Sequence, residues 1–170
     1  MAQPLNDVCI SATPIVIPAS GNICITSSTA TATSTTWANA ICGQTTWTND
    51  VWFSFVSNGS LNTITVRPTG SPAAQQVGVA VWTGNCANLT SVGTACNIAA
   101  TAGGTATVTQ ASPAGTTYYV EVSSFTAAGG FELCINSATP PPSPGSSCAT
   151  AAVVCDLSSF TLASGPAGTG

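Results

Sequence analysis

The sequence predicts an all-β protein, a β-sandwich of about eight or nine strands. Three observations support this prediction. Short apolar segments recur between clusters of Gly, Pro, Asn and Ser, which is typical of strands joined by turns. No stretch repeats apolar residues every 3.6 positions between helix caps. Eight cysteines are dispersed over 170 residues, which is typical of a fold stapled by disulfides.

The first three candidate strands are β-branched or rich in threonine. Residues 15–17 read Ile-Val-Ile, residues 23–26 read Ile-Cys-Ile-Thr, and residues 30–37 carry four threonines. Side chains that branch at Cβ pack well on a pleated surface, and we therefore predict strands at all three segments.

The next candidate strand, residues 50–56, alternates clearly. Val51, Phe53 and Phe55 share one face, while Trp52 and Ser54 share the other. Alternation with a period of two is the pattern of a strand that covers a core with one face. We expect Trp52 to be in the core or half-buried.

The remaining candidate strands follow the same pattern. Residues 61–67 place Ile64 and Val66 on one face, and residues 77–82 alternate valines with Gly78, Ala80 and Trp82. Further candidates are residues 105–109, 118–122 and 131–135, the last with Phe131, Leu133 and Ile135 on one face.

The charge content argues against an enzyme and against a nucleic-acid-binding protein. The chain has one Arg, no Lys, no His and five acidic residues, so that 4% of it is charged, against about a quarter in a typical domain. Acid–base and nucleophilic catalysis need positioned acids and bases. Nucleic-acid binding through phosphates requires clustered Lys or Arg, which Arg67 alone cannot supply. We expect Glu121 and Glu132 on solvated strand faces, and no apolar run approaches a membrane span.

The cysteines predict four disulfides in an extracellular, oxidising compartment. They are Cys9, Cys24, Cys42, Cys86, Cys96, Cys134, Cys148 and Cys155. No two lie close enough for a typical zinc site and histidine is absent, so we expect no metal and no cofactor. Local spacing favours Cys86–Cys96 and Cys148–Cys155. The other four leave the pairing open, and we expect Cys9–Cys42 and Cys24–Cys134.

The composition divides the chain into three parts. We predict a β-sandwich module over residues 1–138, a Pro-rich linker over 139–146, and the start of a following module or a donor-strand-like tail over 147–170. Consecutive prolines favour extended polyproline II. Apolar residues in the tail would be buried by pairing with an open sheet edge, which is strand addition and could build a filament; they are Val153, Val154, Leu157, Phe160 and Leu162.

Two tryptophans, Trp37 and Trp47, flank Cys42 in a stretch rich in Thr, Asn and Gln. Exposed aromatic rings beside amides can stack on sugars, so a ligand-stacking site is one interpretation. Packing around a disulfide is the other. Threonine arrays such as residues 31–33 and 105–107 raise the possibility of an ice-binding surface, but they lack a regular repeat along the chain.

Several motifs resemble a module of secreted Bacteroidetes surface proteins, the pre-peptidase C-terminal type of domain. They are Asn-Asp-Val-Cys from residue 6, Cys-Gly from 42, Asp-Val-Trp-Phe-Ser-Phe from 50, Val-Ala-Val-Trp-Thr-Gly-Asn-Cys from 79, Leu-Thr from 89, Ala-Cys-Asn from 95, Gly-Thr-Thr-Tyr-Tyr-Val-Glu-Val from 115 and Gly-Phe-Glu-Leu-Cys from 130. The resemblance covers about residues 6–136. It implies an antiparallel jelly-roll-like β-sandwich, a place among repeats in exported proteins beside adhesins, proteases or carbohydrate-active domains, and export by type IX secretion.

One departure from that family concerns calcium. Family members often carry Cys-Asn-Asp-Asp where this chain has Cys96-Asn97-Ile98-Ala99. Calcium usually takes several oxygen ligands that include acids, so the resemblance does not extend to a metal site. Asp7 and Asp50 are the acids left near such loops, and we expect them to serve as turn or strand-edge residues.

Together these observations predict a structural or adhesive module that is secreted or displayed at the cell surface. Its expected partners are other copies of itself or neighbouring repeats, in a filament assembled by strand addition, and surface glycans. The alternative is a carbohydrate-binding accessory module of a secreted enzyme. We expect no catalysis, no nucleic acid and no membrane span.

Overall fold

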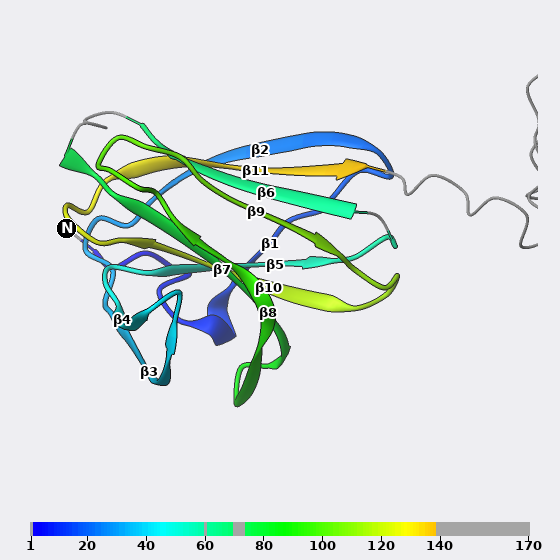
Figure 1. The fold of residues 1–170 in the computed structure, drawn as a ribbon, viewed down its shortest axis with the longest axis horizontal. Helices are drawn as coiled ribbons and strands as arrows, with labels where there is room; N and C mark the ends of the chain where they lie inside the picture. Colours follow the sequence, from blue (N-terminus) through cyan, green and yellow to red (C-terminus); the bar gives the residue numbers. More distant parts are fainter. Residues whose placement is uncertain (1, 60, 70–73, 139–170) are drawn as a thin grey trace, which may run out of the picture. The chain divides into compact units, whose positions relative to one another are not determined.

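The computed structural model describes residues 2–59, 61–69 and 74–138. Over these residues the chain forms β-strands and a short 3-10 turn, η1 (Cys9–Ser11), as Figure 1 shows. The strands are β1 (Thr13–Pro14), β2 (Gly21–Ser28), β3 (Thr35–Ile41), β4 (Gln44–Trp47), β5 (Val51–Val56), β6 (Leu61–Pro68), β7 (Val77–Asn85), β8 (Asn88–Ile98), β9 (Ala106–Ala111), β10 (Thr117–Ser124) and β11 (Gly130–Ala138).

Two sheets face each other, and a hairpin lies outside one of them (Figure 1). The five-stranded sheet has the order β1-β5-β10-β7-β8, the four-stranded sheet has the order β2-β11-β6-β9, and β3 pairs with β4. All pairings are antiparallel except β1 with β5, which is parallel over Thr13 and Pro14. The predicted fold class, an antiparallel disulfide-stapled β-sandwich, is confirmed.

The main core lies between the two sheets. The alternation predicted for residues 50–56 is confirmed, since Val51, Phe53 and Phe55 all point into this core. Phe53 meets Phe131 of the opposite sheet edge to face, with ring centroids 6.1 Å apart. The predicted inward faces of β6 and β11 are also buried here, and they comprise Ile64, Val66, Phe131, Leu133 and Ile135.

A second, smaller core lies on the outer face of the five-stranded sheet. It contains Trp47, Trp52, Ala80 and Trp82. Trp52 is buried, as predicted, but on the face opposite Phe53, because the β3–β4 hairpin covers that face. Strand β4 was not predicted, since Gln-Thr-Thr-Trp shows no apolar alternation. Strand β8 was not predicted either, because small and polar residues interrupt its sequence.

The disulfides confirm one predicted pair and correct two. Cys24 pairs with Cys134, as expected, whereas Cys9 pairs with Cys86 and Cys42 pairs with Cys96. The predicted pairs Cys86–Cys96 and Cys9–Cys42 are therefore wrong. Cys86 lies at the β7–β8 turn, whereas Cys96 lies far along β8 opposite Ala80. Ten residues of extended chain span about 30 Å, and a disulfide needs Cα atoms within about 7 Å.

Some predictions fall outside the described residues. They are the pair Cys148–Cys155, the linker 139–146 and the segment 147–170 with its apolar residues.

Candidate binding groove

The outer face of the five-stranded sheet buries a carboxylate, that of Glu121. It lies in the middle of β10 between Trp52 of β5 and Ala80 of β7, and its exposed fraction is 0%. Oε2 accepts a hydrogen bond from Trp82 Nε1 at 3.0 Å, and Oε1 accepts one from Trp37 Nε1 at 3.3 Å. The expectation of a solvated strand face is wrong for Glu121, because the β3–β4 hairpin covers this face of the sheet.

A second buried carboxylate, that of Asp50, lies immediately before β5. Oδ1 accepts a hydrogen bond from the Thr35 backbone N–H at 2.7 Å. Oδ2 accepts bonds from Thr35 Oγ1 at 2.8 Å and from Trp52 Nε1 at 2.9 Å. Asp50 therefore fixes the start of β3, in agreement with the strand-edge role expected for it. Asp7 likewise accepts hydrogen bonds from the backbone and hydroxyl of Thr33.

Burial dominates the electrostatics of both carboxylates. It raises the pKa of Asp50 to about 6, although hydrogen bonds from Thr35 and Trp52 act to lower it. Burial, and then the nearby charge of Asp50, raise the pKa of Glu121 well above its ordinary value, while the Trp37 and Trp82 indoles act in the opposite direction. In both residues burial shifts the equilibrium toward the protonated form, because a buried charge loses its hydration.

The four tryptophans have different surroundings. Trp37 stacks on Trp82 with ring centroids 4.0 Å apart and meets Trp52 at an edge. Trp47 has an exposed fraction of 0%, donates from Nε1 to the Ile41 carbonyl and packs against Phe125. It therefore packs beside the Cys42 disulfide and offers no surface for the ligand stacking suggested by the sequence. Trp37 is half-buried and lies at the surface.

Two hollows in the surface adjoin Trp37. The first holds about 500 Å³ and reaches Trp52, Asn88 and the Cys9–Cys86 disulfide. The second holds about 350 Å³ and reaches Asn39, Trp82 and Thr90. Trp37 and Leu89 line both. We call the two hollows together the Trp37 groove.

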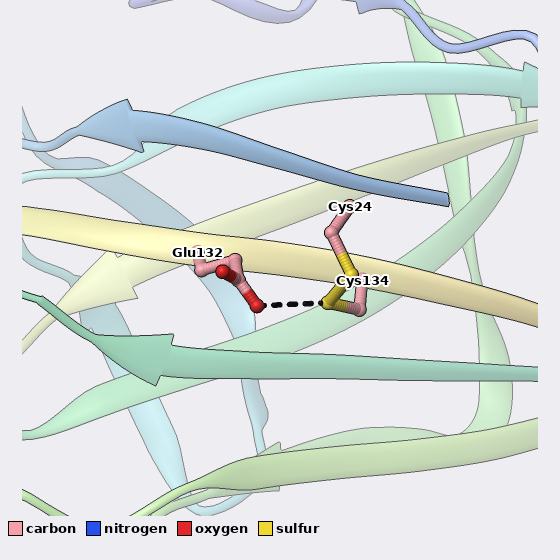
Figure 2. Close-up of side chains that lie close together, drawn as sticks. All are labelled: Cys24, Glu132 and Cys134. Carbon is pink, nitrogen blue, oxygen red and sulfur yellow. Dashed lines mark hydrogen bonds between the residues drawn. A yellow bond between two sulfur atoms is a disulfide. The ribbon is translucent and has the colours of Figure 1, made fainter. Parts of the chain in front are cut away.

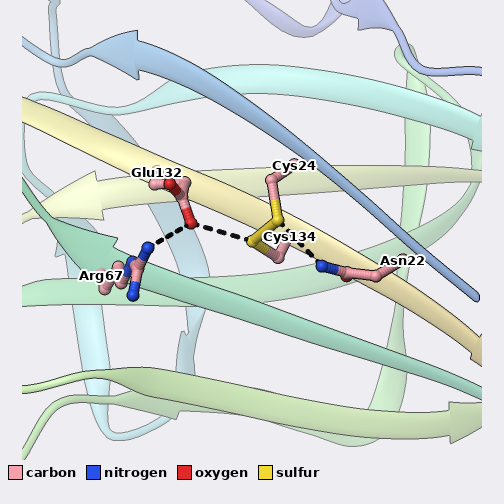
Figure 3. Close-up of polar contacts among 5 residues, drawn as sticks. All are labelled: Asn22, Cys24, Arg67, Glu132 and Cys134. Carbon is pink, nitrogen blue, oxygen red and sulfur yellow. Dashed lines mark hydrogen bonds and ion pairs between the residues drawn. A yellow bond between two sulfur atoms is a disulfide. The ribbon is translucent and has the colours of Figure 1, made fainter.

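A second cluster lies on the outer face of the four-stranded sheet, around the exposed disulfide Cys24–Cys134 (Figure 2). The Glu132 Oε2 atom lies 3.1 Å from Cys134 Sγ and 2.8 Å from Arg67 Nη2, and Asn22 Nδ2 donates to Cys24 Sγ at 3.0 Å (Figure 3). The two sulfurs and the carboxylate lie close enough to hold a metal ion. However, both sulfurs belong to the disulfide, so neither is a thiolate that could bind one.

The carboxylates of Glu121 and Glu132 lie in different sheets. Glu121 is on β10 and faces the hairpin, whereas Glu132 is on β11 and forms an ion pair with Arg67 on the opposite outer face. They do not form a carboxylate pair for acid–base chemistry. The strand-face position expected for Glu132 agrees with its partly exposed side chain.

The threonine arrays named from the sequence are not equivalent. Residues 31 and 33 lie in the loop before β3, whereas Thr107 lies in β9. On the outer face of the four-stranded sheet, Thr63 bonds to Thr109 and Thr65 bonds to Thr107. These four hydroxyls pair with each other next to the Arg67–Glu132 ion pair.

Two solved structures are similar to this chain at a low level. One is the pre-peptidase C-terminal domain of a collagenase from Bacillus anthracis, with 13% identity, 74% of this chain and 94% of that chain covered, and a TM-score of 0.44. The other is PliG from Aeromonas hydrophila, a periplasmic lysozyme inhibitor of g-type lysozyme, with 12% identity, coverage of 74% and 96%, and a TM-score of 0.40. These likenesses concern the fold. No protein-family model and no curated protein matches the sequence.

Within the described ranges, none of the helical structure is long or apolar enough to cross a membrane.

Proposed function

We propose that this chain is a non-catalytic structural and adhesive module of an extracellular protein, which associates by strand addition along β2. The observation that carries the proposal is the open edge of the four-stranded sheet. Strand β2 lies at that edge and pairs only with β11 in the described sheet. An edge strand presents unpaired backbone groups that a further strand can join.

The register identifies which backbone groups of β2 face the open side. Cys24 lies directly opposite Cys134 with Cα atoms 4.1 Å apart. This short separation is that of a non-hydrogen-bonded antiparallel pair. The N–H and C=O of Cys24 therefore point away from β11. Because hydrogen-bonded and non-hydrogen-bonded pairs alternate along the strand, the N–H and C=O of Asn22 and Thr26 also point away from β11. These are the groups that an added strand would bond.

The sequence of β2 contains neither the charges nor the prolines that usually protect an edge strand from pairing. Residues 21–28 read Gly-Asn-Ile-Cys-Ile-Thr-Ser-Ser, without a charge or a proline. Edge strands of most proteins use lysine, proline or bulges to prevent association, and this chain contains no lysine. Because β2 is uncharged, no like charges within β2 oppose an added strand.

The apolar segment predicted as a donor, with Val153, Val154, Leu157, Phe160 and Leu162, supplies a candidate strand from another copy. Edge pairing gives affinity through the main chain, while side chains of the donor fill adjacent apolar surface.

Two further observations support an extracellular, non-catalytic role. Three disulfides join cysteines far apart in the chain, and such bonds persist in oxidising compartments. The acidic side chains at the candidate sites all have structural partners: indoles for Glu121, Thr35 and Trp52 for Asp50, and Arg67 for Glu132.

The test is the assembly state of the oxidised protein, measured by light scattering and electron microscopy. We expect dimers or polymers for the full chain and a monomer after removal of residues 146–170. Thr26→Pro should also give a monomer, because it removes an outward N–H and leaves the bonds between Ile25 and β11. Thr26→Ser is the control and should assemble. A monomeric full chain, or assembly that Thr26→Pro leaves intact, would contradict the proposal.

A further inference from the structure

We propose that the Trp37 groove binds a neutral, extended carbohydrate, with a sugar ring lying against the Trp37 indole. This site lies on the outer face of the five-stranded sheet, whereas the strand addition proposed above uses the β2 edge of the other sheet. The two proposals are therefore independent.

Trp37 is the tryptophan through which this chain can contact a ligand. Trp47, Trp52 and Trp82 are at most 2% exposed, whereas Trp37 is half-buried and lines both hollows. Its Nε1 donates inward to Glu121, so the groove receives ring carbons rather than the polar N–H. An aromatic ring face has negative character and attracts the weakly positive C–H groups of a sugar ring.

The groove is held rigid from three directions. The Cys9–Cys86 disulfide forms part of the wall of the first hollow. Cys42–Cys96 ties the β3–β4 turn to β8. Asp50 and Glu121 fix β3 through Thr35 and Trp37. A site whose walls are fixed before binding loses little conformational entropy when the ligand arrives, which favours affinity.

The chemistry of the lining selects a neutral polyol. None of the residues that line the two hollows, all of them described, is charged; the polar ones are hydroxyl and amide side chains, namely Thr35, Asn39, Asn88, Thr90 and Ser91. Hydroxyls and amides both donate and accept hydrogen bonds, which suits sugar hydroxyl groups. The groove lining has no positively charged side chain to pair with a phosphate, a sulfate or a uronic acid. The charged groups behind it, Glu121 and Asp50, are acids.

The shape of the groove favours a chain of sugar rings over a single ring. Trp37 and Leu89 line both hollows, so the two hollows adjoin the same pair of side chains. A ligand that fills both hollows must extend past Trp37 and Leu89. We therefore expect oligosaccharides to bind more tightly than the corresponding monosaccharides.

The experiment measures acrylamide quenching of tryptophan fluorescence in the full-length oxidised protein. The probes are cellohexaose, mannohexaose and chitohexaose, with polygalacturonate as an acidic comparator and a neutral Ser/Thr-rich peptide as a non-sugar comparator. At least one neutral hexasaccharide should protect Trp37 from quenching in a saturable way. Polygalacturonate and the peptide should not protect it.

Two variants place the binding at the groove. Leu89→Asp replaces an apolar side chain that lines both hollows with a charged one, away from the carboxylate contacts, and should weaken binding by about tenfold or more. Thr109→Asp is the matched control, since it places the same charge on an exposed strand of the other sheet, and its affinity should equal that of the native chain. Circular dichroism verifies that both variants are folded.

Three results would overturn the proposal: no protection by any of the three hexasaccharides at millimolar concentration, equal protection by polygalacturonate or the peptide, or unchanged affinity in Leu89→Asp. The Thr26→Pro variant separates this proposal from the previous one. It should bind the sugar with native affinity even if assembly is lost, because β2 contributes nothing to the groove.

Discussion

The Trp82 indole donates a hydrogen bond to the Glu121 carboxylate at 3.0 Å, and the partner oxygen of that carboxylate accepts one from Trp37 on the covering hairpin. One acidic residue thus connects the sheet to the hairpin above it. Asp50 makes a parallel connection through Trp52 on the sheet and Thr35 on the hairpin. The hairpin is therefore held by two buried carboxylates as well as by apolar packing.

The first prediction is that the protein is less stable at pH 8 than at pH 4. The folded pKa of Asp50, about 6, exceeds its ordinary value of 3.8, and that of Glu121 is also raised. A raised pKa gives stability that is complete below the unfolded pKa and is lost as the pH rises through the folded pKa. Between pH 4 and pH 8 the loss from Asp50 is about 2 kcal/mol, because the unfolded residue is already partly ionised at pH 4. Urea unfolding at the two pH values measures it.

Asp50→Asn should reduce this pH dependence, whatever it does to stability at a single pH. Asp7→Asn serves as the control, because it also removes an aspartate that caps a loop, and it should leave the pH dependence in place. Equal stability of the native protein at pH 4 and pH 8 would rule out buried ionisable carboxylates under the hairpin.

The second prediction concerns the disulfide that anchors the hairpin. The double variant Cys42→Ser with Cys96→Ser should increase acrylamide quenching of the tryptophans, because the β3–β4 turn loses its bond to β8. Its free energy of unfolding should fall by about 4 kcal/mol from the chain entropy of the closed loop. The double variant Cys24→Ser with Cys134→Ser should lose a similar amount, yet leave the quenching unchanged, since that disulfide lies on the other sheet.

The third prediction concerns the packing of Trp47 between the hairpin and the five-stranded sheet. Trp47→Ala should cost about 3–5 kcal/mol, as expected when a fully buried aromatic ring is removed. Thr45→Ala, at an exposed position of the same strand, should change stability by less than about 0.5 kcal/mol. Thermal unfolding of both variants measures the difference, and a mild effect of Trp47→Ala would mean that the hairpin does not pack on the sheet as described.

The fourth prediction concerns Gly84, near the β7–β8 turn beside the groove. Its φ is +97°, and a Cβ there would lie 2.4 Å from the Asn88 carbonyl oxygen. Gly84→Ala should therefore destabilise the protein by more than the 1–2 kcal/mol or so that a left-handed conformation costs by itself. Gly43→Ala tests that cost alone, because its φ is +79° and nothing lies within 4 Å of the added Cβ. Equal losses in the two variants would contradict the close approach at Asn88.

The sequence predicted the strands that face the main core because a period of two is visible in one segment at a time. Val51, Phe53 and Phe55 needed no knowledge of their neighbours to be placed together. The burial of the outer face could not be predicted in this way. Glu121 lies between two core valines, and this alternation predicts a solvated side chain. Glu121 is buried because the β3–β4 hairpin packs over the face of β10 opposite the valines.

The disulfide pairings depended on the order of strands, which local spacing does not contain. Cys24 and Cys134 meet because β2 and β11 are neighbours, although they are 110 residues apart. Cys86 and Cys96 are close in sequence but are carried apart by β8. The groove depended on the same order, because its walls come from η1, β3, β5, β7, the β7–β8 turn and β8. The sequence alone pointed to Trp37 and Trp47 as equivalent candidates.

The central claim is that the open side of β2 is an assembly surface, and amide hydrogen exchange tests it most directly. In dilute monomer the N–H groups of Cys24 and Thr26 should exchange rapidly, whereas that of Ile25, bonded to β11, should be protected. As the protein concentration rises and copies associate, Cys24 and Thr26 should gain protection together while Ile25 stays protected. Rapid exchange at Cys24 and Thr26 in the fully assembled protein would contradict strand addition at this edge.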